Sequence, residues 1–199
     1  MNTLKAEKRT MDTKAKRLRR EGYVTGNVFG REMEGSMPVK IEKSAVEKLL
    51  KTSNKGSQIM LDVDGQSYDV LIKEIQFNPL KGQVDEIDFQ ALVSTEKVHS
   101  VAEVILVNHD KLAAGVLQQH LEEISFRALP SALVDKVMVD VGDMKIGDVL
   151  KVKDLDIAKD KDVDLKTAPE AAVVSVAAVH VDPALEAEEE TAEEEKESK

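Results

Sequence analysis

Cysteine is absent from the 199 residues, which excludes disulfides, thiolate metal sites and a cysteine nucleophile. Tryptophan is also absent, and aromatic residues make up only 3% of the chain, so any core has to consist of valine, isoleucine and leucine. No stretch approaches the ~20 apolar residues of a membrane span. The cations near the N-terminus are followed by no apolar run, so we expect no secretory signal. The sequence therefore predicts a soluble, cytoplasmic protein that does not interact with a membrane.

The usual ingredients of a catalytic site are scarce as well. The four histidines show neither metal-ligand spacing nor an H-E-x-x-H pattern; they are His99, His109, His120 and His180. The glycine-containing segments at residues 24–28 and 112–115 lack the Lys-Ser/Thr of a phosphate loop. We expect no enzyme, no cofactor, no bound metal and no small-molecule substrate. An enzyme whose site forms only in three dimensions stays open as a third hypothesis.

What the chain does contain is an uneven distribution of charge. The formal net charge is −10, yet the first twenty residues hold only two acids against eight bases. The bases are Lys5, Lys8, Arg9, Lys14, Lys16, Arg17, Arg19 and Arg20. A local excess of positive charge in an acidic protein indicates a polyanionic partner.

The densest part of this basic segment surrounds one apolar residue, Leu18. Its neighbours within five positions are Lys16, Arg17, Arg19 and Arg20. If Leu18 packs inward, the cations are held outward on a short turn, and arginine can bind phosphate oxygens through two N–H groups. An ordinary solvated basic face is the alternative interpretation.

The first half of the chain predicts a small, mixed β-barrel that ends near residue 92. Strands are expected at residues 23–29, 38–41, 58–63, 66–72 and 84–92, because apolar and polar residues alternate there. Asp64 and Gly65 predict a type I′ hairpin turn, in which both central residues take positive φ. Ser44 and Glu47 form a capping-box pattern and predict a helix over residues 44–53.

The second half predicts a further all-β domain. Short strands separated by turns are expected at residues 101–107, 124–128, 136–141, 146–152 and 173–181, and residues 112–117 are expected to form a loop. Polar residues interrupt the apolar pattern at 94–97. We therefore divide the chain into an N-terminal domain (1–93), a C-terminal β domain (94–183) and a tail (184–199).

The tail is predicted to be disordered because of its composition. Residues 185–199 contain eight Glu and two Lys, and such a run cannot bury enough surface to offset the entropy of ordering. Solvating the chain is its simplest role. Repelling nucleic acid, or competing for the basic turn when RNA is absent, is the alternative.

Several motifs together resemble a known family. The run Arg-Leu-Arg-Arg-x-Gly-x-Val at residues 17–24 precedes an aromatic-Gly pair, and Ile-Gln-x-x-Pro and Ile-Asp-Phe follow at 75–79 and 87–89. Residues 130–141 and 146–155 continue the likeness in the same order. The chain resembles the bacterial large-subunit ribosomal protein twenty-five family in its two-domain form, also called the general stress protein Ctc. The resemblance covers nearly the whole chain up to the tail.

The resemblance implies a fold and a function. The N-terminal β-barrel of this family binds 5S rRNA within the large ribosomal subunit, and the C-terminal β domain is an appended module. Carried over by position, the RNA-binding residues are Arg9, Lys14, Arg17, Arg19, Arg20, Phe29, Gln76, Lys81, Glu86 and Asp88. The implied partners are 5S rRNA and other large-subunit proteins, and the implied location is the cytoplasm, on the ribosome.

Several positions depart from the pattern of the family, among them Val24-Thr25-Gly26, the region near Asn78 that lacks the usual basic residues, the shortened loop at Thr13-Lys14, Phe29 and Glu86. Phe29 replaces a tyrosine and loses its hydroxyl, and Glu86 stands where a histidine is usual. Losing a donor or gaining a repulsive charge at an interface costs on the order of 1–3 kcal/mol. The alternative hypothesis is therefore a diverged, stress-associated paralogue that binds 5S rRNA weakly and acts as an interaction protein.

Overall fold

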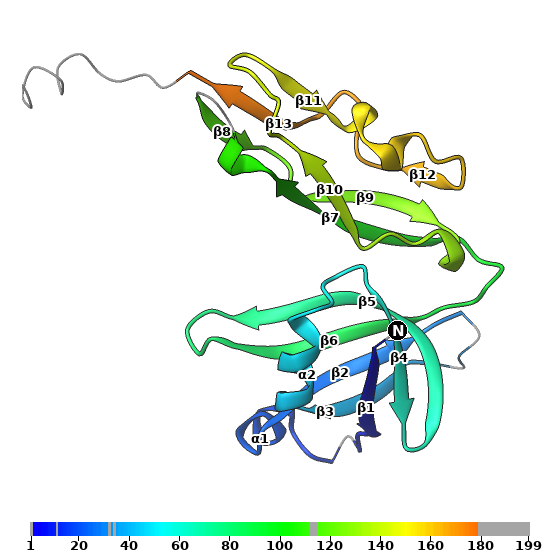
Figure 1. Cartoon of the computed structure of the whole chain (residues 1–199). Coiled ribbons are helices and arrows are strands. Elements are labelled where there is room, and N and C mark those ends of the chain that lie inside the picture. Colours follow the sequence, from blue (N-terminus) through cyan, green and yellow to red (C-terminus); the bar gives the residue numbers. More distant parts are fainter. Residues whose placement is uncertain (1, 11, 32, 34, 112–114, 179–199) are drawn as a thin grey trace, which may run out of the picture.

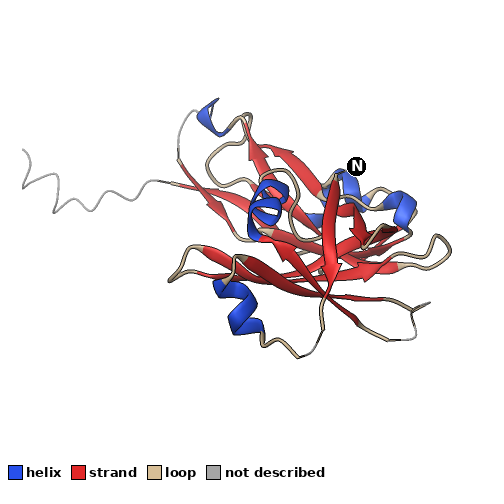
Figure 2. Ribbon diagram, turned by 90° about the horizontal axis from the view of Figure 1, so that it is seen from below, coloured by secondary structure: helices blue, strands red, loops and turns tan. Residues whose placement is uncertain are grey.

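Alternating apolar residues produce a mainly β chain, as predicted (Figure 1). The computed structural model describes residues 2–10, 12–31, 33, 35–111 and 115–178. Figure 2 shows that strands make up most of this part and that the helices are short. The predicted tail at 184–199 and the end of the last predicted strand, 179–181, lie outside the described residues.

The first unit is a closed barrel with the strand order β1-β3-β2-β6-β5-β4. Its strands are β1 (Thr3–Lys8), β2 (Tyr23–Phe29), β3 (Met37–Glu42), β4 (Gln58–Val63), β5 (Gln66–Asn78) and β6 (Gln83–Ala91). Two parallel pairs, β1 with β4 and β2 with β6, join segments that are distant in the sequence. The interior is filled by fully buried side chains such as Phe89, Ile87 and Ile41. The residues of β2, β5 and β6 that point away from this interior form part of the outer surface of the barrel.

The two predicted local features of the barrel have different outcomes. Asp64 and Gly65 have φ values of 53° and 88°, so the predicted hairpin turn is confirmed. The helix α2 (Lys43–Leu50) is also present, but the capping box is wrong, because Ser44 lies inside the helix and Glu42 is its N-cap. The amide of Lys43, the first residue of the helix, donates to the carbonyl of Gly22, and no side-chain cap is formed at Glu42.

The second unit consists of two sheets that share one core. One has the order β10-β7-β9-β12 and the other β11-β13-β8, and Ile124, Phe126 and Val173 are fully buried between them. The strands are β7 (Val98–Val107), β8 (Val116–Gln119), β9 (Glu123–Ala128), β10 (Lys136–Asp140), β11 (Val149–Lys151), β12 (Val163–Leu165) and β13 (Ala172–Ala177). Short 3₁₀ turns connect them; they are η1 (His109–Lys111), η2 (Pro130–Ala132), η3 (Val152–Asp154) and η4 (Asp156–Ala158).

The predicted loop at residues 112–117 is wrong in its last two residues. Val116 and Leu117 begin β8, which pairs with Ala177 and Val176 of β13, and residues 112–114 lie outside the described part. The partner strand is about sixty positions away, so no local pattern could reveal this pairing. The division of the chain at residue 93 remains our proposal; it falls between β6 and β7.

Polar contacts join the two units. Asn54 Nδ2 donates to Glu103 at 2.6 Å, Lys55 Nζ lies 3.1 Å from Glu123, and Lys73 Nζ donates to the carbonyl of His99 at 2.8 Å. Burial lowers the pKa of Lys73, and the nearby Lys55 lowers it further. None of the helices in the described ranges is long and apolar enough to cross a membrane.

Candidate nucleic-acid interface

The basic segment forms a six-residue helix, α1 (Ala15–Arg20), that lies beside β2. Leu18 is its buried residue, which confirms that the apolar anchor packs inward. Gly22, with a φ of +90°, provides the left-handed turn into β2. Arg17 is on the outer side, where 77% of its side chain is exposed and its Nε lies 2.8 Å from Glu21. That hydrogen bond and charge raise the pKa of Arg17.

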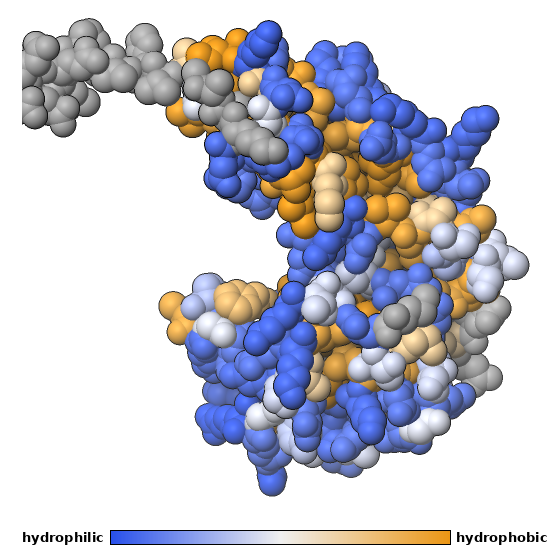
Figure 3. All heavy atoms as spheres, viewed as in Figure 1, coloured by the Kyte–Doolittle hydropathy of each residue, from blue (hydrophilic) through white to orange (hydrophobic). Residues whose placement is uncertain are grey.

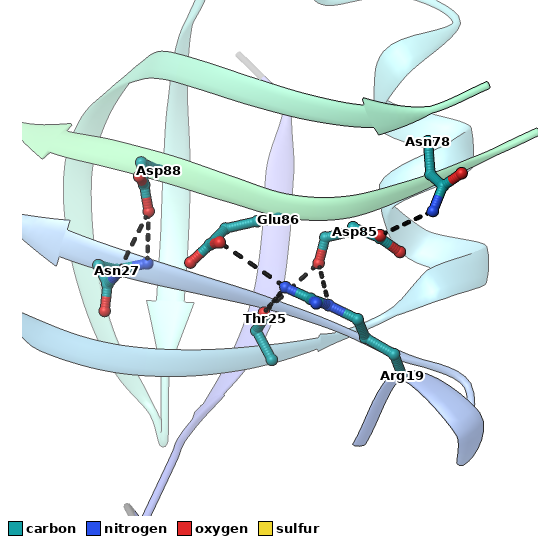
Figure 4. Close-up of polar contacts among 7 residues, drawn as sticks. All are labelled: Arg19, Thr25, Asn27, Asn78, Asp85, Glu86 and Asp88. Carbon is teal, nitrogen blue, oxygen red and sulfur yellow. Dashed lines mark hydrogen bonds and ion pairs between the residues drawn. The ribbon is translucent and has the colours of Figure 1, made fainter. Parts of the chain in front are cut away.

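Arg19 differs from the expectation that all cations around Leu18 face outward. Figure 4 shows its guanidinium reaching over β2 to the edge of β6. Its Nε donates to the carbonyl of Asp85 at 2.9 Å, and its Nη2 lies 3.3 Å from Thr25 Oγ1. The same Nη2 lies 3.7 Å from the carboxylate of Glu86. Arg19 is thus occupied by protein groups before any ligand arrives.

An irregularity in the β5–β6 ladder makes this contact possible. Glu86 pairs with Gln76 and Val84 pairs with Phe77, so Asp85 is an extra residue in β6 without a partner in β5. Such a bulge locally disrupts the ladder. The carbonyl of Asp85 is then available for Arg19 and for the buried hydroxyl of Thr25.

The neighbouring rows of the surface are polar. Asp88 Oδ1 accepts hydrogen bonds from the backbone N–H of Asn27 at 3.1 Å and from its Nδ2 at 3.3 Å. Asp88 Oδ2 has no hydrogen-bond partner among the described residues. Gln76 is exposed and lies across from Glu86, and Phe29 is 37% exposed and lies across from Gln90. Gln76, Glu86 and Asp88 thus give this strand face polar side chains, and Phe29 adds an exposed aromatic ring.

Three predicted residues meet at one cavity, where α1 faces the β5–β6 hairpin. The cavity has a volume of about 420 Å³, and its lining residues are Lys16, Arg19, Arg20, Lys81, Gln83 and Asp85. The prediction of the site did not include Lys16, Gln83 and Asp85. Lys16 belongs to the same basic run, so its charge was the available signal. Gln83 gave no signal, because only the hairpin brings it to α1.

The remaining predicted residues lie apart from this cavity. Arg9 is half-buried, and its Nη2 donates to the carbonyl of Thr13 at 3.0 Å, so it ties down the loop before α1. Lys14 is exposed at the N-cap of α1. Phe29, Gln76, Glu86 and Asp88 extend along the outer strand face. The β5–β6 hairpin carries two exposed apolar residues near its tip, Phe77 and Leu80. Figure 3 shows that hydrophilic residues cover much of the visible face of the molecule.

A larger groove, of about 840 Å³, runs over β1 and α2. It brings together none of the ten predicted residues. Among the residues that the structure describes, no group of three His, Cys, Asp or Glu side chains is placed to hold a metal ion.

Comparison with known proteins identifies the family of this chain. The model of the Ribosomal L25p family matches residues 4–89, and the model named Ribosomal protein TL5, C-terminal domain, matches residues 97–180. A protein of Caldanaerobacter subterraneus named large ribosomal subunit protein bL25 is 31% identical over 177 residues, which is 87% of this chain and 88% of that protein. The chain belongs to the bL25 family. The predicted resemblance is therefore confirmed.

Other bL25 proteins have a similar sequence identity to this chain. The protein from Geobacillus thermodenitrificans is 34% identical over 142 residues, covering 70% of this chain and 67% of its own length. The protein from Listeria monocytogenes serotype 4b is 32% identical over 180 residues, covering 88% and 86%. The bL25 family consists of structural ribosomal proteins of the large subunit, and membership confirms the prediction that the chain is not an enzyme.

Proposed function

We propose that this member of the bL25 family binds 5S rRNA through residues 1–93 as a structural part of the large ribosomal subunit. The observation that carries the proposal is the cationic surface of α1 in an otherwise acidic chain. Arg20, Lys16 and Lys81 are exposed, and they make no side-chain hydrogen bond or ion pair with another described residue. Unpaired cations on a rigid element are suited to a phosphate backbone.

The strand face beside α1 fits the remaining surface of an RNA helix. A-form RNA has a wide, shallow minor groove that displays 2′-hydroxyls and base edges, and a flat polar sheet can approach it. Asp88 Oδ2 is a free acceptor on this face, and Gln76 supplies both donors and acceptors. The proposed partners are 5S rRNA and neighbouring proteins of the large subunit, and the proposed location is on the ribosome in the cytoplasm.

The proposal predicts steep salt dependence that α1 controls. Replacing Arg17→Ala together with Arg20→Ala should lower the affinity for 5S rRNA and reduce the slope of log K against log salt by about two. Binding is measured across a salt series with the full chain. The control is Lys161→Ala with Lys166→Ala, which removes the same charge from the second unit. An unchanged affinity and slope in the arginine variant would contradict the proposal.

A second candidate is favoured by one contact. Glu86 pairs with Arg19, so its anion lies on the proposed RNA surface and neutralises one of the cations. The chain would then be a stress-associated interaction protein whose 5S rRNA binding has weakened. Restoring the usual residues, Glu86→His with Phe29→Tyr, should in that case raise the affinity for 5S rRNA by tenfold or more. If the affinity does not change, this candidate is rejected.

A further inference from the structure

The open edges of the described strands all lie in the second unit. The barrel is closed, which removes its edges, whereas the two sheets of the second unit end in β10, β12, β11 and β8. Of these four strands β10 is the longest, with five residues against three or four. It also carries Met138, whose side chain is 71% exposed. An exposed edge with an apolar side chain is a template for pairing with another chain.

The backbone of β10 presents hydrogen-bonding groups to its outer side. The residues that flank the strand, Asp135 and Val141, both form backbone hydrogen bonds with β7. Because a parallel ladder uses every second residue of a strand, the odd-numbered residues between them face β7 as well. The N–H and C=O groups of Lys136, Met138 and Asp140 therefore point away from β7, to the outer side of β10.

The side chains of these three residues carry opposite charges at the two ends of the strand. Lys136 makes no side-chain hydrogen bond or ion pair with another described residue. The carboxylate of Asp140 accepts hydrogen bonds from Asn108 Nδ2 at 2.8 Å and from the N–H of Gly142 at 2.9 Å. These donors are neutral, so the carboxylate stays negative and is held in place. Charges on an edge strand normally oppose pairing, but here they are equally spaced about Met138 and of opposite sign.

We propose that β10 is a docking edge for a second copy of this chain, whose own β10 pairs with it antiparallel, centred on Met138. In that register Lys136 of each copy lies opposite Asp140 of the other. The residues whose backbone groups point outward then form hydrogen-bonded pairs, which gives roughly six bonds across the junction. A parallel arrangement would set like charges side by side, which is destabilising, so the charges select the antiparallel one.

The resulting dimer joins two four-stranded sheets into one continuous sheet. None of its three pairing residues belongs to the proposed RNA surface, so the inference goes beyond the proposed function and does not depend on it. A contact between two five-residue strands is smaller than the standard interface of about 1,600 Å². The dimer is therefore weak and dissociates on dilution.

A single introduced cysteine tests the pairing, because the chain has none of its own. In Met138→Cys the two thiols face each other across a hydrogen-bonded pair whose Cα atoms are about 5.5 Å apart, which suits a disulfide. Under mild oxidation the full chain should form a covalent dimer about tenfold faster than Val149→Cys does. Val149 is the control, because it is 48% exposed on another open edge strand, β11. Equal rates, or faster dimer formation by Val149→Cys, would overturn the inference.

Two charge variants test the register by sedimentation equilibrium. Lys136→Asp and Asp140→Lys each place like charges opposite one another, so each alone should be monomeric at concentrations where the wild type is partly dimeric. An equimolar mixture of the two restores both opposite-charge pairs, and the dimer should return to about the wild-type fraction. A wild type that stays monomeric at the highest soluble concentration would overturn the inference, as would a mixture of folded variants that stays monomeric. The cysteine test does not use these charges, so it decides the case if a charge variant fails to fold.

Discussion

The two carboxylate oxygens of Asp88 have different environments, and this difference shows how an acid fits a surface that we propose to contact RNA. Oδ1 accepts both hydrogen bonds from Asn27 and is therefore fixed. Oδ2 has no partner within the described residues and remains available. A carboxylate facing phosphate is unfavourable, so the oxygen is useful only as an acceptor from a 2′-hydroxyl or a base amino group.

Replacing Asp88→Asn tests this role with little change of shape. The asparagine oxygen can keep the bonds from Asn27, while its NH₂ replaces the free acceptor with a donor. We expect the affinity for 5S rRNA to fall about tenfold, which corresponds to about 1.4 kcal/mol. The free energy of unfolding should change by less than about 0.5 kcal/mol. An affinity equal to that of the wild type would show that Oδ2 does not face the RNA.

A second acid, Glu170, has a pKa that two neighbouring lysines lower. Hydrogen bonds from Lys151 and Lys153, at 2.8 and 3.0 Å, lower its pKa from 4.5 to about 2. Because the folded-state pKa lies below the unfolded value, the associated stability is present above pH 4.5 and is lost as the pH falls toward 2. The carboxylate is solvent-exposed, so added salt should weaken the effect.

An NMR titration of the Glu170 carboxyl carbon measures this directly. The midpoint should lie near 2 in the wild type and near the ordinary value of 4.5 when Lys151→Met and Lys153→Met are combined. A midpoint of 4.5 in the wild type would show that the two lysines do not hold the carboxylate in solution.

Among the elements, β2 and β6 are the paired strands that carry part of the proposed RNA surface. Their parallel pairing places Gly26 directly opposite Ile87. A Cβ on Gly26 would lie 2.1 Å from the backbone carbonyl oxygen of Ile87, and backbone on a central strand cannot move aside cheaply. Glycine is required here because the two strands approach closely.

Replacing Gly26→Ala should therefore destabilise the chain by about 2–4 kcal/mol. Gly35→Ala is the matched control, because a Cβ there meets nothing within 4 Å, and it should leave stability nearly unchanged. Urea unfolding of both variants measures the difference. Equal midpoints for Gly26→Ala and the wild type would contradict the strand contact.

The elements also show which parts of the fold the sequence could predict. The hairpin at Asp64 and Gly65 was predictable, because two adjacent residues determine its backbone angles. Leu18 is buried, which is the condition on which the interpretation of the basic turn depended. The turn of Arg19 toward β6 was not predictable, since its acceptor is a carbonyl that only the bulge at Asp85 sets free. Lys81 and Gln83 join α1 through tertiary structure alone.

At the scale of the whole molecule, the two units meet through polar side chains and one close backbone contact. A Cβ on Gly56 would lie 1.9 Å from the carbonyl oxygen of Val101, so the chain segments touch there. Asn54 and Lys55 add a hydrogen bond to Glu103 and an ion pair with Glu123. The Lys55–Glu123 pair is partly exposed and contributes only about 0–1 kcal/mol, and salt weakens it, whereas the hydrogen bond between Asn54 and Glu103 is part-buried.

Combining Asn54→Ala with Lys55→Ala should loosen the junction without unfolding either unit. We expect a larger radius of gyration in small-angle X-ray scattering at low salt, and the difference from the wild type should shrink in high salt, which screens the ion pair. Lys48→Ala with Lys51→Ala removes cations from α2 and its C-cap, outside these junction contacts, and serves as the control. A scattering profile identical to that of the wild type would mean that other contacts fix the two units.

The central claim is that a net-acidic member of the bL25 family binds 5S rRNA through the cations of α1 and the strand face beside it. The measurement that tests it most directly is binding of the full wild-type chain to 5S rRNA across a salt series, with an unrelated structured RNA of similar length as control. We predict tight binding that exceeds the control and weakens steeply with salt. Binding to 5S rRNA that is no stronger than binding to the control RNA would contradict the claim.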